Sequence, residues 1–435
     1  MDTITISPRG PIDAAIALPG SKSVTNRALI IGALAEGETT LRNWLESEDT
    51  AVMIRCLLAL GFRVSRGEEA GGKLVIAGGG GEIPSPGASL NALNSGTTIR
   101  FLAGLVSLGR GRYILDGDER MRQRPIEPLL EALRAWGIAA HSLRGNGCPP
   151  VEIAASGIPG GDCELGGDIS SQFLSSLLLS GPYARKDLAI RIRGELVSRP
   201  YVEMTQKMMR DFGVAVERED WRFFRVPAGR RYRGREYLVE GDASSASYFW
   251  AAAAITGGRA RVTNIGEESI QGDARFVEIL EKMGATVRRG KDWTEVRGPI
   301  RRGIDVDLND MPDMVPTLAV AALFAPGKTA IRNVANLRFK ESDRLKAVAA
   351  EIRRIGGKAV ELPDGLVIEG GELRGAKIET YRDHRIAMAF SLVGLKVPGI
   401  KIKDPGCVAK TFPGFFDLFL NLPPRSEKWE VRSKK

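Results

Sequence analysis

The chain contains little cysteine and almost no histidine. Its 435 residues include four cysteines and two histidines. The cysteines stand far apart, without a CxxC pair, at Cys56, Cys148, Cys163 and Cys407. This spacing excludes a disulfide framework and a zinc site built from cysteine and histidine. We therefore expect chemistry that needs neither a bound metal nor another cofactor.

Long apolar runs are also missing. The longest, YFWAAAAI at residues 248–255, is far shorter than the roughly 18 residues that a membrane span requires. The N-terminus shows no charged region followed by an apolar one, as an export signal would. The sequence predicts a cytoplasmic protein with no membrane partner.

Aromatic residues are sparse, at 6% of the chain, whereas the net charge is +9. The positive charge favours anionic partners. Nucleic-acid binding typically uses basic patches with aromatic residues between them, but here most basic residues alternate with Asp and Glu. We expect small anionic substrates and no nucleic acid. The alternative of a non-enzymatic nucleic-acid binder would be supported by binding that weakens steeply with salt, without turnover.

A repeat runs along the whole chain. Five amphipathic segments each end in a glycine that precedes a strand-like segment, and the spacings are 76, 76, 71 and 72 residues. The glycines are Gly61, Gly137, Gly213, Gly284 and Gly356. Each is predicted to end a helix in the left-handed conformation. One sixth of the chain is close to this period, so a sixth unit fits.

A second feature recurs with the same period: a polar cluster followed by a helix of small apolar residues. Its six copies begin near residues 21, 94, 169, 242, 311 and 381. Serine, threonine, asparagine and aspartate at these starts are typical helix N-caps. Six such units, in a chain too long for one core, predict a mixed α/β (α+β) protein with two domains of three repeats each.

These helix starts contain more than capping residues. They also carry Lys22, Arg27, Arg100, Gln172, Asp313, His384 and Arg385. Symmetric packing of three repeats would gather three helix N-termini at one end of each domain, where they could hold phosphate or carboxylate. For any one start taken alone, simple capping is the favoured interpretation, but it does not explain these additional side chains.

Several motifs in a fixed order carry a family resemblance. They are PGSKSVTNRAL, NSGTTIR, DGDERMRQRPIEPL, ISSQF, SRPY, NDMPDM, NLRFKESDR and DHRIAM. With them the chain resembles the 5-enolpyruvylshikimate-3-phosphate synthases, a family of enolpyruvyl transferases, from about residue 4 to residue 422. The resemblance implies transfer of the enolpyruvyl group of phosphoenolpyruvate to the 5-hydroxyl of shikimate 3-phosphate, through a tetrahedral intermediate, in aromatic amino acid biosynthesis.

The same resemblance implies a domain organisation. Each domain would contain three βαβαββ units, and two crossover strands would join domains that close on the substrates. The first domain would comprise residues 1–19 and 240–427, and the second residues 20–239. Residues 428–435 would form a basic tail. We further expect a monomer.

The resemblance also assigns binding residues. Those implied for phosphoenolpyruvate are Lys22, Gly96, Arg124, Gln172, Arg344, Arg385 and Lys410. Those implied for shikimate 3-phosphate are Lys22, Ser23, Arg27, Ser170, Ser171, Gln172, Ser198, Tyr201, Asp313, Asn336 and Lys340. Arginine matches carboxylate and phosphate bidentately, and hydroxyls both donate to and accept from a hydroxylated ring.

Four residues are implied as catalytic. Asp313 would take the proton of the substrate hydroxyl, while Glu341, assisted by Lys22, would exchange a proton at C3 of phosphoenolpyruvate. His384 would polarise the site. Three of the four also fit a structural role: Asp313 as a helix cap, Glu341 in a surface ion-pair network and His384 as a packed side chain.

Two related activities compete with this reading. Enolpyruvyl transferases that act on UDP-N-acetylglucosamine typically have a reactive cysteine before the arginine that corresponds to Arg124, and the loop GDERMRQR contains none. RNA 3′-phosphate cyclases share the repeat but need a nucleotide-accepting histidine. The glycine-rich segment 77–87 lacks a nucleotide-loop pattern, and we expect a flexible hairpin or loop there.

Overall fold

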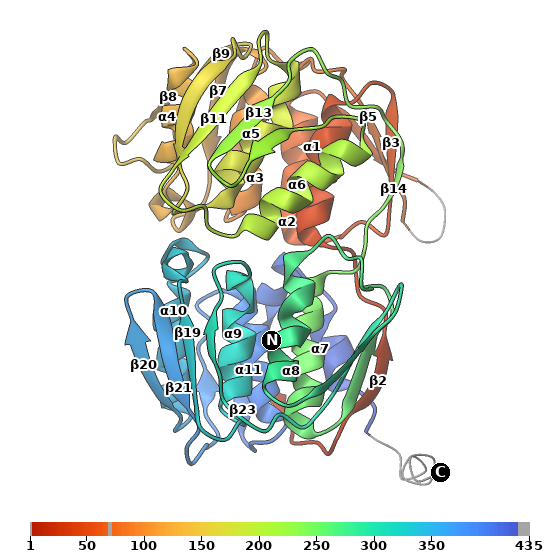
Figure 1. Cartoon of the computed structure of the whole chain (residues 1–435), viewed down its shortest axis with the longest axis vertical. Helices are drawn as coiled ribbons and strands as arrows, with labels where there is room; N and C mark the ends of the chain where they lie inside the picture. Colours follow the sequence, from red (N-terminus) through yellow and green to blue (C-terminus); the bar gives the residue numbers. More distant parts are fainter. Residues whose placement is uncertain (1, 68–71, 425–435) are drawn as a thin grey trace. The chain divides into compact units, whose positions relative to one another are not determined.

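The structure is a computed structural model that describes residues 2–67 and 72–424 (Figure 1). It divides into two compact units. Unit 1 contains residues 2–19, 240–338 and 342–424, and unit 2 contains residues 20–239 and 339–341. The basic tail expected at 428–435 lies outside the described residues. No helix among the described residues is long and apolar enough to cross a membrane.

Six sheets share one strand pattern, in which a parallel pair is extended by antiparallel partners. In unit 2 the sheets are β14(Glu236–Leu238)-β3(Glu38–Arg42)-β5(Leu74–Ala77)-β4(Arg63–Arg66), β6(Gly87–Asn91)-β7(Arg110–Asp116)-β9(Val151–Ser156)-β8(Ala139–Ser142) and β10(Gly161–Gly166)-β11(Leu188–Arg193)-β13(Phe223–Val226)-β12(Glu217–Glu219). In each, the first two strands are parallel and the others antiparallel.

Unit 1 repeats the pattern with contributions from both ends of the chain. Its sheets are β2(Asp13–Ile16)-β15(Arg259–Val262)-β17(Thr294–Arg297)-β16(Thr286–Arg289), β18(Asp305–Asp307)-β19(Lys328–Arg332)-β21(Gly365–Glu369)-β20(Lys358–Leu362) and β22(Lys377–Ile378)-β23(Ile400–Lys403)-β1(Thr3–Ile6). The N-terminal strands β1 and β2 pair with β23 and β15. The predicted mixed α/β fold with repeated units is therefore confirmed.

Each unit is built around three inner helices that contact one another. They are α1(Lys22–Leu34), α3(Gly96–Val106) and α5(Ser171–Ser180) in unit 2, and α7(Ala243–Thr256), α9(Val315–Ala322) and α11(His384–Gly394) in unit 1. The remaining α-helices are α2(Glu48–Ala59), α4(Glu127–Ala135), α6(Arg199–Asp211), α8(Phe276–Lys282), α10(Arg344–Arg354) and α12(Phe415–Leu420).

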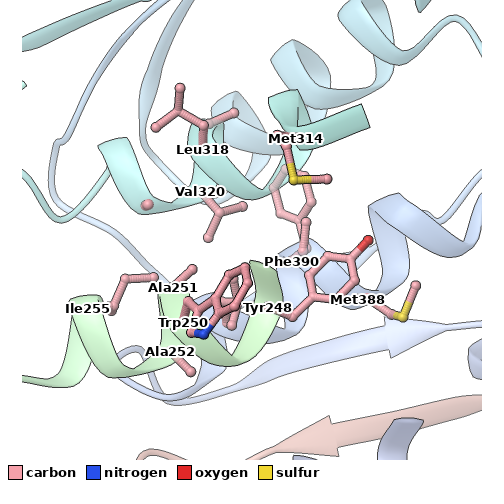
Figure 2. Packing of buried hydrophobic residues seen from close by; sticks show 14 of the residues in the cluster. Tyr248, Trp250, Ala251, Ala252, Ile255, Met314, Leu318, Val320, Met388 and Phe390 are labelled. Atoms are coloured by element: carbon pink, nitrogen blue, oxygen red, sulfur yellow. The ribbon is translucent and has the colours of Figure 1, made fainter. Parts of the chain in front are cut away.

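The inner helices are buried on nearly every side, as expected for helices enclosed by other elements. Figure 2 shows Trp250 of α7, Val320 of α9 and Phe390 of α11 turned toward a common core, and all three are fully buried. Small residues permit this close packing. At Gly104 an added Cβ would lie 2.5 Å from the Ser176 hydroxyl, so only glycine lets α3 approach α5.

The five periodic glycines follow the ends of outer helices. Their φ angles lie between 80° and 107°. This is the left-handed region, which glycine adopts without the steric cost of a Cβ. The predicted helix ends at Gly61, Gly137, Gly213, Gly284 and Gly356 are confirmed.

Candidate functional site

The inner helices of unit 2 begin with serine N-caps. The hydroxyls of Ser21, Ser95 and Ser170 accept hydrogen bonds from backbone amides of α1, α3 and α5, respectively. Each cap satisfies one of the amides that a helix start leaves without an intrahelical partner. Of the binding residues predicted in unit 2, Lys22, Ser23, Gly96, Ser170, Ser171 and Gln172 stand at these starts.

Lys22 occupies the first turn of α1, where the helix dipole disfavours a cation. Its ammonium lies 3.4 Å from the carboxylate of Asp49, which is 3% exposed. Asp49 in turn lies in the first turn of α2, where a carboxylate is favoured by the dipole of its own helix. Asp49 thus compensates the unfavourable position of Lys22 and fixes the direction of its side chain.

Gly96 begins α3 directly beneath a guanidinium. A Cβ at this position would lie 2.4 Å from Nη2 of Arg124. Arg124 is 3% exposed, and its Nη1 donates to the backbone and side-chain oxygens of Asn94 at 3.1 Å each. Because Gly96 has no side chain, the guanidinium of Arg124 can lie against the start of α3. Its positive charge adds to the positive end of the helix dipole.

A second buried arginine joins α3 to α5. Arg100 donates to the Gln172 side-chain oxygen at 2.7 Å, and the Gln172 amide donates to the Thr97 hydroxyl at 3.1 Å. Burial, reinforced by the nearby Arg124 and opposed by Glu341 and Cys148, lowers the pKa of Arg100 to about 9. The chain of bonds sets the rotamer of Gln172 and concentrates positive charge around it.

Arg27 lies one turn after Ser23 and is 2% exposed. It donates to Thr205 Oγ1 at 2.7 Å, to the Ser23 carbonyl at 2.9 Å and to the Tyr201 carbonyl at 3.0 Å. Burial lowers its pKa to about 10. Arg27 therefore ties α1 to α6 and contributes its charge through neutral partners.

Four of the hydroxyl-bearing residues predicted for the shikimate ring lie at the starts of α5 and α6 in unit 2. Ser170 and Ser171 begin α5 and are 7% and 4% exposed. Ser198 precedes α6 in the left-handed conformation, with φ of 56°, and Tyr201 lies in the first turn of that helix. A non-glycine residue in this region carries backbone strain, which the surrounding structure must stabilise.

Residues 339–341 group with unit 2. Arg120 donates to the Lys340 carbonyl through Nε at 3.0 Å and Nη2 at 2.9 Å. Arg124 donates to the Phe339 carbonyl at 3.2 Å. The backbone of this segment is thereby held, and the side chains of Lys340 and Glu341 are partly exposed.

The predicted residues of unit 1 converge on one carboxylate. Asp313, in a 3-10 turn before α9, accepts from Arg344 Nη1 at 2.8 Å through one oxygen and from Arg385 Nη2 at 2.7 Å through the other. Both arginines are at least 94% buried, whereas the Asp313 side chain is 18% exposed. The starts of α9, α10 and α11 are thus joined at a partly accessible carboxylate.

Asp383 lies beneath this network. The carboxylate is fully buried, caps α11 and accepts from Arg344 Nε at 2.8 Å and Nη2 at 3.3 Å. The Ser342 hydroxyl donates to it at 3.0 Å. A fork of this kind fixes the plane of a guanidinium. Asp383 therefore orients Arg344 toward Asp313.

Three further predicted residues of unit 1 are buried. His384 is fully buried at the first position of α11, with Nδ1 3.7 Å from Asp383 Oδ1. Asn336 is 4% exposed, and Lys410 is 7% exposed. Arg385 also donates to the Ser244 hydroxyl of α7 at 3.2 Å. Unit 1 therefore gathers side chains from the starts of α7, α9, α10 and α11.

Sequence reasoning missed Asp49, Asp383 and Ser244 as parts of these clusters. Asp49 sits in the segment SEDT, where the serine forms a capping box with Thr50, and Asp383 opens the motif DHRIAM. Both patterns are typical of helix starts and do not reveal which cation the carboxylate will meet. Among the described residues, no group of three or more His, Cys, Asp or Glu side chains could hold a metal ion.

Comparisons relate this arrangement to known proteins. A model of the family EPSP synthase (3-phosphoshikimate 1-carboxyvinyltransferase) matches residues 6–419. A Nostoc punctiforme protein named 3-phosphoshikimate 1-carboxyvinyltransferase is 47% identical over 424 residues, or 97% of this chain and 99% of that protein. One of the same name from Photobacterium profundum is 45% identical over 432 residues, or 97% and 99%. A solved EPSP synthase from Acinetobacter baumannii has a TM-score of 0.80 at 30% identity, covering 96% of this chain and 97% of that one.

Proposed function

Because the chain belongs to the EPSP synthase (3-phosphoshikimate 1-carboxyvinyltransferase) family, we propose that it transfers the enolpyruvyl group of phosphoenolpyruvate to the 5-hydroxyl of shikimate 3-phosphate. Phosphate is the second product. The observation that best supports this assignment is Asp313, a partly exposed carboxylate held between Arg344 and Arg385. A base next to guanidinium groups suits the addition of a hydroxyl to an anionic substrate.

Cations of both units neutralise the substrates in this proposal. Lys22 and Arg124 act from unit 2, and Arg344, Arg385 and Lys410 act from unit 1. Phosphoenolpyruvate carries a phosphate and a carboxylate, and several positive charges are needed to take such an ion out of water. In the addition step the same charges stabilise the developing tetrahedral intermediate.

The shikimate 3-phosphate residues divide in the same way. Unit 2 supplies Ser23, Arg27, Ser170, Ser171, Gln172, Ser198, Tyr201 and Lys340, and unit 1 supplies Asp313 and Asn336. The serines and Tyr201 match ring hydroxyls as both donors and acceptors. In this proposal Arg27 binds mainly through its charge, since its donors are occupied by Thr205 and backbone carbonyls.

Proton transfer needs two groups. Asp313 accepts the hydroxyl proton once the substrate anions take over one of its arginine contacts. Glu341, with Lys22, delivers a proton to C3 and later removes one as phosphate leaves. His384 lies beside Arg385 and polarises the site through that neighbour. The proposal needs no metal, and it includes a monomer that acts in the cytoplasm without nucleic acid.

The test measures phosphate release from phosphoenolpyruvate with and without shikimate 3-phosphate, in EDTA. We expect release that requires shikimate 3-phosphate and is unchanged by the chelator. UDP-N-acetylglucosamine is run in parallel. Release only with the UDP-sugar would move the protein to the other enolpyruvyl transferase activity, and release with neither acceptor would overturn the proposal.

A further inference from the structure

Unit 2 contains a cavity of about 630 Å³ that none of the assigned residues lines. Its walls include Leu108 and Arg110, which follow α3, and Tyr183 and Arg185, which follow α5. The glycine-rich segment completes it at the end of α1, where Gly79 N donates to the Ala33 carbonyl at 2.8 Å. The cavity therefore lies at the C-terminal ends of the inner helices whose N-terminal ends carry the predicted substrate residues.

This position separates the cavity from the candidate site. The inner helix α1 has 13 residues. At 1.5 Å per residue, its two ends are about 20 Å apart. A ligand in the cavity would therefore not touch Lys22 or Gly96, but it would contact the same helix bundle.

Three arginines line the cavity: Arg110, Arg185 and Arg231. Arg185 donates to the Ser156 carbonyl at 2.6 Å, and Arg231 donates to the Gly80 carbonyl. The backbone of Arg110 pairs with β9, but among the described residues its side chain makes neither a hydrogen bond nor an ion pair. Glu82 is the one acidic residue in the lining, so the walls keep an excess of positive charge.

The glycine-rich segment is shaped to fit this wall. Gly81 has a φ of 95°, and a Cβ there would lie 2.1 Å from the Tyr183 ring and 2.8 Å from Arg231 Nη1. Arg231 in turn lies over the Tyr183 ring, 5.1 Å from its centroid. Only glycine allows the segment to close on this pair. The segment, for which a flexible hairpin or loop was expected, is a loop between β5 and β6 that packs against Tyr183 and Arg231.

The Tyr183 hydroxyl both accepts and donates a hydrogen bond. The oxygen accepts from Tyr232 N at 3.1 Å, and the hydroxyl donates to the Leu34 carbonyl at the end of α1. Burial raises the pKa of Tyr183 to about 12, so the ring stays neutral beside the arginines. The cavity wall is thus pre-formed, which reduces the entropy cost of binding.

We propose that this cavity is a second ligand site, for a small polyanion with phosphate or carboxylate groups. Its volume lies within the range of small-molecule sites. Guanidinium groups bind both kinds of oxyanion through paired donors, and Arg110 has its donors available. The ligand would bind at the end of the inner helix bundle opposite to the substrate residues.

Calorimetric titration with pyrophosphate in EDTA tests the proposal, with citrate as the carboxylate arm. Wild-type protein is compared with Arg110→Ala and Arg110→Glu. The matched control is Arg112→Ala, because Arg112 lies on the same strand β7 but outside the cavity and pairs with Glu152. We expect Arg110→Ala to weaken one binding component at least tenfold, Arg110→Glu to abolish it, and the control to keep it. The two arms distinguish phosphate from carboxylate selectivity.

Catalysis provides an independent check. Both Arg110 variants should keep the wild-type KM for phosphoenolpyruvate, because their cavity is remote from the substrate residues. Since the binding readout does not depend on turnover, it separates this proposal from the proposed function. Identical titration curves for wild type and both Arg110 variants would overturn the second site, as would binding that shikimate 3-phosphate displaces completely.

Discussion

The two units hold their buried arginines at the helix starts in different ways. In unit 2, Arg27, Arg100 and Arg124 donate to backbone carbonyls, amides and hydroxyls, and among the described residues none of the three forms an ion pair. In unit 1, Arg344 and Arg385 are neutralised by Asp313 and Asp383. Neutral partners fix a guanidinium without cancelling its charge.

This difference indicates different tasks. Unit 2 keeps uncompensated positive charge, which can attract and hold an anion from water. In unit 1 the charges of Arg344 and Arg385 are paired with carboxylates, and in the proposed reaction a substrate anion would replace one of these contacts. The comparison leads to four predictions, from the largest expected effect to the smallest.

Asp383→Asn should have the largest effect, because it leaves the 1%-exposed Arg344 without its buried countercharge. We expect a loss of about 3 kcal/mol of unfolding free energy. We also expect kcat/KM to fall roughly 100-fold as Arg344 loses its orientation toward Asp313. Urea denaturation and steady-state kinetics measure the two quantities.

The matched control is Asp305→Asn, which removes an exposed Arg–Asp pair with Arg332 at 2.8 and 2.5 Å in the same unit. This change should cost less than about 1 kcal/mol. Equal losses in the two variants would show that the buried network of unit 1 is no different from a surface pair.

Gly96→Ala tests unit 2, in which the charge of Arg124 is not paired with a carboxylate of the described residues. The added methyl group would lie 2.4 Å from Arg124 Nη2 and displace the guanidinium from the start of α3. We expect kcat/KM for phosphoenolpyruvate to fall by a factor of roughly 10 to 100, mainly through KM, with little change in Tm. Gly10→Ala, where a Cβ meets nothing within 4 Å, is the control. An unchanged KM in Gly96→Ala would rule out a substrate role for this arrangement.

Asp49→Asn tests the ion pair between Lys22 and Asp49 of α2. Without the carboxylate the ammonium loses its fixed direction, and we expect kcat/KM to fall about tenfold, which corresponds to about 1.4 kcal/mol. Stability should change by less than about 1 kcal/mol. The control is Glu48→Gln, since this exposed residue shares the same helix turn. If both variants lost the same activity, the helix dipole and not the pair would be responsible.

The smallest effect concerns the thiols of the two units. Burial raises the pKa of Cys163 in unit 2 and of Cys407 in unit 1 to about 12. Because the folded-state pKa exceeds the unfolded value of 9.0, these thiols favour folding below pH 9, and that contribution is lost as the pH rises toward 12. Reaction with a thiol reagent at pH 8 should be slow in native protein and fast in urea. Fast reaction of all four cysteines in the native state would contradict this prediction.

Much of the fold follows from periodic features of the sequence. The period of the glycines and the polar helix starts predicts the repeated α/β units, because a left-handed helix end and an N-cap depend on residues a few positions apart. A glycine after a helix, such as Gly61 or Gly356, and a serine before one, such as Ser21 or Ser95, favour the same local conformation in any protein. These elements could therefore be predicted without knowledge of their neighbours.

The partners of the charged residues could not be predicted in this way. Lys22 meets Asp49 across 27 positions, and Asp313 meets Arg385 across 72. The packing of the glycine-rich loop could not be predicted either, because its contact with Tyr183 spans about 100 positions. Local sequence does not encode which distant side chains will meet.

The sequence by itself determined the six repeats, their helix ends and the residues that stand at each helix start, since short-range sterics and hydrogen bonding are sufficient to specify them. Only the tertiary structure decided which cations are paired with a carboxylate and which have only neutral hydrogen-bond partners among the described residues. The physical reason is that a buried ion pair requires two groups to meet in one geometry, and this depends on how the inner helices pack against one another.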